Sequence, residues 1–194
     1  MLTARRLGKR YGEKRVLRGI DLVLPRGGFL VVTGANGAGK TTLLRICAGL
    51  AQPTDGTIER SATRAQVGYL GHEPLVYREL TALENLELYG CLYRVPERRE
   101  RIGMLLERFQ LWDARSERAG SFSRGMLQRL ALCRAFLHEP ELYVLDEPFS
   151  GLDEAGVELL DRELADRRAN GTFVVATHDP ARLERLATAR IAFA

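Results

Sequence analysis

The sequence has no long hydrophobic run. Nowhere in its 194 residues does it approach the roughly 20 consecutive apolar residues that a membrane-spanning helix requires. The opening segment, MLTARRLGKRYG, also lacks the apolar centre of a secretory signal. These two absences predict a soluble chain of the cytoplasm. Because 45% of the residues are hydrophobic, the chain can still bury one sizeable core, and we expect a single domain.

Cysteine is also scarce. The three cysteines, Cys47, Cys91 and Cys133, lie far apart, and each is surrounded by an apolar, helix-like window. An odd number at such spacing argues against a disulfide framework and against a cysteine metal site. We therefore expect three buried, reduced thiols.

Lysine is rarer than the net charge of +4 suggests, because Lys9, Lys14 and Lys40 are the only lysines and arginine supplies the remaining positive charge. The arginines alternate with acidic residues and form no dense basic face. This pattern argues against a surface for DNA or RNA, so no nucleic-acid partner is expected.

Strand-like and helix-like segments alternate along the chain. The segment FLVVT at 29–33 is apolar without alternation, which is typical of a strand covered on both faces by helices. Further strands are expected at TIER, VGYL, ELYVLDEP, TFVVATHD and ARIAFA, and helices at about 41–50, 154–169 and 179–187. A long helical signal over about 81–137 opens with a capping box at Thr81 and Glu84. The alternation predicts an α/β domain with a mostly parallel sheet.

The segment GANGAGKT at 34–41 matches the phosphate-loop pattern G-x-x-x-x-G-K-[ST] between a strand and a helix. Its glycines let backbone N–H groups curl around phosphates, Lys40 would reach the terminal phosphates, and the Thr41 hydroxyl would ligate Mg²⁺. The expected nucleotide-binding residues here are Gly34, Ala35, Asn36, Gly37, Ala38, Gly39, Lys40, Thr41 and Thr42. ATP with Mg²⁺ is the predicted ligand.

Two acids follow the buried strand LYVL. Asp146 ends that strand, which suits a metal ligand on the far side of the ion from Thr41. Glu147 comes directly after it, which suits a general base that polarises the attacking water.

A second phosphate-seeking helix start lies at SFSRGMLQR, residues 121–129, far along the chain from Gly34. One triphosphate cannot occupy both helix starts unless the fold brings them together. The alternative is that a second copy of the chain supplies the second start.

With these motifs in this order, the chain resembles the nucleotide-binding subunit of an ABC transporter over nearly its whole length. The signature of that family, L-S-G-G-Q, stands here as FSRGM, which keeps Ser123 and Gly125 but has Arg124 for the first glycine and Met126 for the glutamine. The resemblance implies a homodimer in which two chains pair head to tail around two MgATP. Ser123 and Gly125 of one copy would then cap the ATP held on the phosphate loop of the other.

Further positions match the same family. Tyr11 resembles the aromatic that stacks on adenine, residues 150–153 (SGLD) the loop that communicates across the dimer, and His178 the switch histidine that orients Glu147. His72 stands where the family usually has glutamine, and is assigned to the metal or the attacking water. His138 lacks such a context and is expected on the surface near a helix end.

The implied fold is a P-loop NTPase (RecA-like) core with a mostly parallel sheet, an N-terminal antiparallel β subdomain and an inserted α-helical subdomain. All of 1–194 would form one ATP-binding domain, with the core in 1–75 and 138–194 and the helical subdomain at about 76–137.

The implied partner is an integral membrane permease subunit, on the inner face of the cell membrane. Near its docking surface we expect Leu75 and Tyr89 to be buried and Tyr77 to be partly exposed. The short chain, LGHEP and ELTALENL are similar to the ATPase of the haem exporter of cytochrome c maturation. The alternatives are the ATPase of another exporter, a soluble ABC-type ATPase acting on nucleic acid or ribosomes, and a nucleotide-gated regulator with little hydrolysis.

Overall fold

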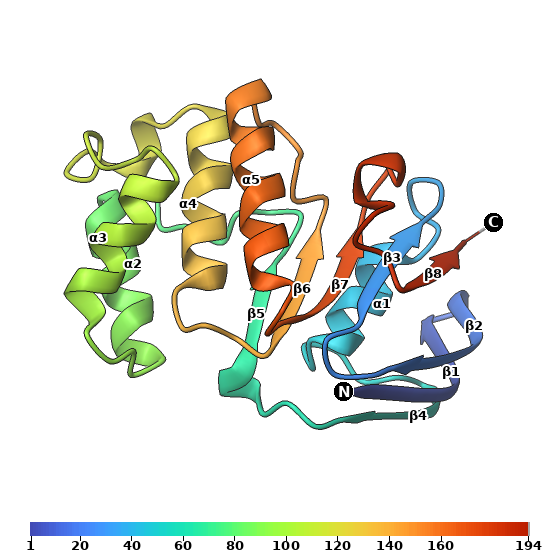
Figure 1. Cartoon of the computed structure of the whole chain (residues 1–194). Helices are drawn as coiled ribbons and strands as arrows, with labels where there is room; N and C mark the ends of the chain where they lie inside the picture. The colour runs from blue at the N-terminus through green and yellow to red at the C-terminus, as the bar shows by residue number, and fades with distance from the viewer. Residues whose placement is uncertain (194) are drawn as a thin grey trace.

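The chain folds into two sheets and a set of helices in the computed structural model, which describes residues 1–193 (Figure 1). A small antiparallel sheet has the strand order β2-β1-β4. Its strands are β1 (Leu2–Tyr11), β2 (Lys14–Leu24) and β4 (Asp55–Arg60). A larger sheet has the order β5-β6-β7-β3-β8, and every neighbouring pair in it is parallel. The predicted α/β fold, with one mostly parallel and one N-terminal antiparallel sheet, is confirmed.

The strands of the parallel sheet are short and apolar. They are β3 (Phe29–Thr33), β5 (Val67–Leu70), β6 (Leu142–Asp146), β7 (Thr172–Ala176) and β8 (Ala189–Ala192). Every residue of β6 and β7 is buried, and so is all of β3 except its last residue. This explains why FLVVT shows no alternation, because both faces of the sheet are covered.

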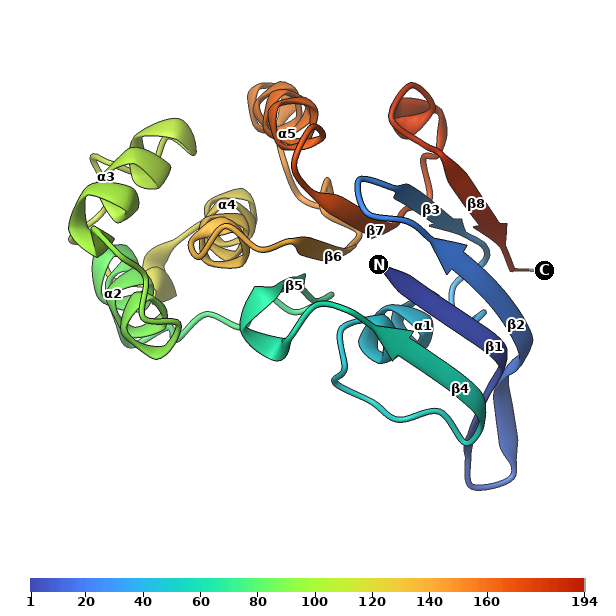
Figure 2. The same cartoon turned by 60° about the horizontal axis from the view of Figure 1, so that its bottom comes forward.

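The two faces of the parallel sheet belong to two different hydrophobic clusters, since successive strand residues point to opposite sides. Leu30, Val32 and Val144 pack in the cluster that contains helix α1 (Lys40–Cys47) and the antiparallel sheet. Phe29 and Val31 pack in the cluster that contains the helices of the other face, among them α5 (Glu154–Arg167). Figure 2 shows α1 and α5 on opposite sides of the sheet.

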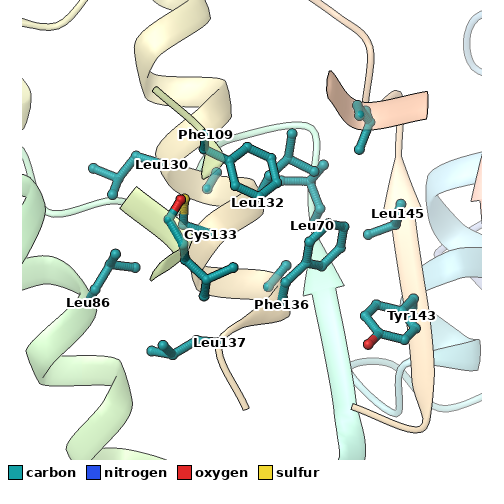
Figure 3. Packing of buried hydrophobic residues seen from close by; sticks show 14 of the residues in the cluster. Leu70, Leu86, Phe109, Leu130, Leu132, Cys133, Phe136, Leu137, Tyr143 and Leu145 are labelled. Carbon is teal, nitrogen blue, oxygen red and sulfur yellow. The ribbon is translucent and has the colours of Figure 1, made fainter. Parts of the chain in front are cut away.

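Three helices separate β5 from β6 in the chain and gather beside the β5 edge of the sheet (Figures 1 and 2). They are α2 (Ala82–Leu92), α3 (Arg98–Arg108) and α4 (Arg124–Phe136). The capping box predicted at Thr81 and Glu84 starts α2, with hydrogen bonds of 2.8 and 3.1 Å. Figure 3 shows Phe136 of α4 near Leu70 and Tyr143, and its ring meets that of Tyr143 edge-on at 5.4 Å.

The prediction of a helix over 179–187 is wrong. The structure has only a 3-10 turn at Ala181–Leu183, followed by further i→i+3 hydrogen bonds. Leu183 is the one fully buried residue of this turn, so there is no apolar face to stabilise a longer helix. The chain must also reach Thr188, which already donates to the carbonyl of Phe29 at 2.8 Å before β8 begins.

Two expectations about buried side chains are also wrong. Cys47 and Cys133 are buried as predicted, and burial raises the pKa of the Cys47 thiol to about 12, but Cys91 lies on the exposed side of α2. Leu75, expected to be buried, is 49% exposed because residues 71–77 form an open loop, and Tyr77 is 51% exposed as predicted. Tyr89 is partly buried, and its hydroxyl donates to the Leu75 carbonyl at 3.1 Å.

His138 lies near the end of a helix as the sequence predicts, but it is half-buried instead of lying on the surface. Helix α4 ends at Phe136, which places His138 over β5, where its Nε2 lies 3.2 Å from the carbonyl of Val67. Its ring stacks on that of Tyr93 with a centroid distance of 4.0 Å. Burial lowers the pKa of His138 to about 4, so the ring is neutral at physiological pH.

Over residues 1–193, the helices are all too short or too polar to cross a lipid bilayer.

Candidate functional site

The phosphate loop connects β3 to α1. Gly34 and Gly39 have φ values of 142° and 113°, which favour glycine. A Cβ on Gly34 would lie 2.8 Å from backbone of Phe193, and one on Gly39 would lie 2.8 Å from the Leu17 side chain. The glycines therefore fix a curled backbone that no larger residue could adopt here.

The start of α1 is open to an anion. Gly39 is the N-cap, no side chain caps the helix, and there is no acidic residue in its first turn. The free N–H groups and the positive end of the helix dipole are thus left to a ligand. Lys40 is 7% exposed, and its Nζ donates to the carbonyls of Gly34 at 2.7 Å and Ala35 at 3.2 Å. Its ammonium group lies inside the loop, as phosphate binding requires.

The side chain of Thr41 meets Asp146 across the loop. Thr41 Oγ1 donates to Asp146 Oδ2 at 2.6 Å, so the start of α1 is joined to the end of β6. Asp146 is 2% exposed, and burial raises its pKa while the Thr41 hydrogen bond opposes the rise. A hydroxyl and a carboxylate are hard oxygen donors that suit Mg²⁺, an ion that keeps several water and phosphate ligands. When bound, Mg²⁺ would neutralise charge that develops on the phosphates.

Within residues 1–193, no three His, Cys, Asp or Glu side chains gather as a metal-ligand cluster. Because the donors of Thr41 and Asp146 are oxygens, they fit magnesium better than zinc or iron.

A cavity of about 220 Å³ lies over the phosphate loop. It is lined by Asn36, Gly37, Lys40, Thr41, His72, Asp146 and Glu147. Residues that are far apart in the sequence therefore converge on one space, and they include both acids and His72. The remaining loop residues support it: Ala38 donates its N–H to the Ala35 carbonyl at 3.2 Å, and Thr42 lies half-buried in the first turn of α1.

Glu147 and His178 are paired. β6 and β7 are neighbours in the sheet, and His178 Nδ1 lies 2.8 Å from Glu147 Oε2. The backbone N–H of His178 donates to the same oxygen at 3.3 Å. The His178 side chain is 75% exposed, whereas that of Glu147 is 16% exposed. The histidine thus holds the carboxylate from the solvent side and can orient it toward the cavity.

Ser123 and Gly125 lie elsewhere. Ser123 is the N-cap of α4 and accepts a hydrogen bond from the N–H of Met126 at 3.2 Å. Neither residue is among the described residues that line the cavity over the phosphate loop. Gly125 packs on the loop after Glu147, where a Cβ would lie 2.9 Å from the Gly151 carbonyl. Arg124, which lies between Ser123 and Gly125, instead lines a neighbouring cavity of about 310 Å³ that also includes His72, Asp146 and Glu147.

Tyr11 also lies outside that cavity. It ends β1, is 49% exposed, and has Lys9 Nζ at 5.0 Å from its ring centroid. An exposed aromatic ring can stack on a base, and adenine stacking by Tyr11 stays a prediction.

Sequence reasoning missed two features next to the acids. Arg124 donates to Ser150 Oγ at 2.8 Å, and Gln128 of α4 donates to the carbonyl of Pro148 at 3.0 Å. Gln128 is 6% exposed. Its burial could have been inferred from the sequence, because it is the only glutamine in the mostly apolar stretch LQRLALCRAF.

Comparison with known proteins agrees with this geometry. The family model described as ABC transporter matches residues 17–150. The daunorubicin resistance ATP-binding protein DrrA3 of Streptomyces coeruleorubidus is 40% identical, over 87% of this chain and 57% of its own length. The cytochrome c biogenesis ATP-binding export protein CcmA of Methylococcus capsulatus is 37% identical, over 86% of this chain and 84% of its own length. The chain thus spans little more than half the length of DrrA3.

Solved structures show the same fold. The structure of an ATP-binding subunit of an ABC transporter superposes with a TM-score of 0.91 at 32% identity, covering 99% of this chain and 85% of the other. A dimeric ATP-binding cassette in a post-hydrolysis state, bound to ADP and Pi, gives a TM-score of 0.86 at 27% identity, covering 100% of this chain and 94% of the other. The chain therefore belongs to the ABC transporter family and is an ATP-binding domain of this family of ATPases.

Proposed function

We propose that the protein binds and hydrolyses ATP with Mg²⁺ as a head-to-tail dimer, and that hydrolysis drives an integral membrane permease subunit. The observation that carries the proposal is the convergence of Lys40, Thr41, Asp146 and Glu147 on one cavity at the open start of α1. A cation, two hard oxygen ligands and a carboxylate base are the groups that phosphoryl transfer to water requires.

Each side chain then has a chemical role. Water attacks the γ-phosphorus, Glu147 accepts the proton of that water, and the bond from the γ-phosphorus to the bridging oxygen breaks to leave ADP. Lys40 and the N–H groups of α1 stabilise the charge on the phosphoryl oxygens. Thr41 and Asp146 would hold Mg²⁺, with His72 at the edge of the cavity as a ligand or as a donor to the water. His178 keeps Glu147 oriented.

The proposed dimer is supported by the position of Ser123 and Gly125. They begin a helix of 13 residues yet line no part of the chain's own phosphate cavity. A second copy turned head to tail would bring them to the exposed side of that cavity. The dimeric state of a cassette that this chain matches with a TM-score of 0.86 supports this arrangement.

A permease subunit is supported by an apolar surface near the site. Leu50, Leu75 and Tyr77 are exposed large hydrophobic residues, and the first two line a cavity of about 450 Å³ that also includes His72. Such a cavity suits a short helix of a membrane protein, and its link to His72 would connect docking with hydrolysis. The protein would then work as a peripheral subunit on the inner face of the cell membrane.

For the cargo, we propose haem export in cytochrome c biogenesis. The 37% identity to CcmA over 86% of this chain supports a CcmA-like subunit. The 40% identity to the daunorubicin resistance protein DrrA3 favours the alternative, the ATPase of another exporter. Loss of the protein should abolish c-type cytochromes under the first proposal and leave them unchanged under the second.

The proposed chemistry is tested with Glu147→Gln, which keeps the shape of the side chain but removes the base. We expect this variant to bind MgATP like the wild type, to accumulate as an ATP-bound dimer in size-exclusion chromatography, and to lose at least about a hundredfold in kcat. Turnover at the wild-type rate would contradict the role of Glu147 as general base.

A further inference from the structure

The backbone at Glu147 is strained. Its φ of 49° lies in the left-handed region, which a non-glycine residue adopts at a cost, and the next residue is a proline, which restricts it further. Such a conformation persists only where neighbouring groups hold it. The direction of the Glu147 carboxylate depends on those groups, because the side chain leaves from this strained backbone.

Two backbone hydrogen bonds hold part of this segment, and a third contact holds the carboxylate of Glu147. The N–H of Glu147 donates to the Ala176 carbonyl at 2.9 Å, and the carbonyl of Glu147 accepts from the N–H of Ser150 at 3.0 Å. His178 Nδ1 lies 2.8 Å from the side-chain carboxylate. These contacts leave the peptide group between Pro148 and the following residue without a partner from the sheet.

Gln128 supplies that partner from another element. Its Nε2 donates to the Pro148 carbonyl at 3.0 Å and lies 3.5 Å from the Glu147 carbonyl. The side chain is 6% exposed, so these hydrogen bonds are made away from most of the water. Removing a buried donor leaves the carbonyl unsatisfied, which makes such a bond matter more than one on the surface.

Gln128 and Glu147 border the same cavity. It has a volume of about 310 Å³, and Leu127 of α4 also lines it. Gln128 therefore lies beside the acid whose following turn it contacts. Gln128 lies five residues after Ser123, so α4 connects the predicted signature with the acid in the same chain.

We propose that Gln128 is a positioning residue for catalysis: its amide fixes the turn at Glu147 and Pro148, and thereby aims the Glu147 carboxylate at the attacking water. This inference rests on the proposed role of Glu147 as general base. It assigns Gln128 an effect on the chemical step and none on the binding of MgATP.

The test compares Gln128→Met, which keeps the length but removes the donor, with Gln128→Ala and with the wild type. Gln110→Met is the matched control, because Gln110 is an exposed glutamine that bonds to Arg129 of α4 and not to the turn. We expect Gln128→Met to lower kcat about tenfold, with the Kd for MgATP within about twofold of wild type, and the control to change neither.

The thermal unfolding midpoints of both Gln128 variants are measured first, because either substitution could destabilise the fold. The more stable of Gln128→Met and Gln128→Ala is assayed at a temperature where it is folded. A kcat within about twofold of wild type, or a loss of MgATP affinity that accounts for the lower rate, would overturn the inference. If Glu147→Gln turns over like wild type, the proposed function fails. If Glu147→Gln is inactive while Gln128→Met is fully active, only the positioning role fails.

Discussion

The starts of α1 and α4 are both rich in small residues, but they are built differently. The start of α1 has no side-chain cap and opens into a cavity with Lys40 and two acids. The start of α4 is capped by its own Ser123 and is exposed, with Arg124 bonded to Ser150 beside it. Under the proposed function, the start of α1 would hold the phosphates and the start of α4 would complete the site of a second copy. The difference between the two helix starts therefore favours a site shared between two chains.

The largest effect is expected at α1. Lys40→Ala removes the only ammonium group inside the phosphate loop, so binding of MgATP and hydrolysis should both fail, with kcat/KM lower by at least about a hundredfold. A titration with a fluorescent ATP analogue and a phosphate-release assay measure the two losses. Near-normal MgATP affinity in Lys40→Ala would mean that α1 is not the phosphate site.

A smaller and different loss is expected at α4. Ser123→Ala removes the cap oxygen but leaves the phosphate loop untouched, so MgATP should still bind while kcat falls about tenfold to a hundredfold. Ser121→Ala is the control, because Ser121 is exposed two residues earlier and donates to the Arg118 carbonyl. Equal kcat in both variants would remove Ser123 from the site.

His138, two residues beyond the C-terminal end of α4, should make the free energy of unfolding depend on pH. The pKa of His138 is about 4 in the folded protein, against an ordinary value of 6.5. Burial lowers this pKa most, and the positive charges of Arg134 and Arg101 lower it further. The unfolded chain binds more protons between these two pH values, so stability should fall as the pH drops from 6.5 to 4, by about 2–3 kcal/mol.

Urea unfolding at several pH values measures this loss. His138→Gln keeps a neutral donor for the Val67 carbonyl but cannot titrate, so its stability should change less across the same window. An equal change in both proteins would show that His138 does not carry the effect.

The smallest effect is expected for Arg124→Gly, which restores the glycine of the signature. Its hydrogen bond to Ser150 is on the surface, where such bonds contribute little, so kcat should change less than about threefold. Steady-state kinetics with MgATP measures this. A larger loss would show that Arg124 itself contacts the phosphates.

The comparison also shows how much of the structure could be predicted from the sequence. The phosphate loop, the acids and the buried strands were predictable because backbone chemistry fixes them locally: glycines at positive φ, a lysine at a helix start, and apolar residues in runs. Gln128 was not predictable as a partner of Pro148, because that contact depends on how α4 packs against β6. The environment of His138 escaped prediction for the same reason, since α2 and β5 enclose it from other parts of the chain.

The most direct test of the central claim mixes Lys40→Ala with Ser123→Ala. If each site combines α1 of one copy with α4 of the other, a mixed dimer has one site with both defects and one intact site. The mixture should then recover about a quarter of the wild-type rate, since half of the dimers are mixed and one of their two sites works. A mixture no more active than its two components would show that each chain uses its own α4, and would contradict the account.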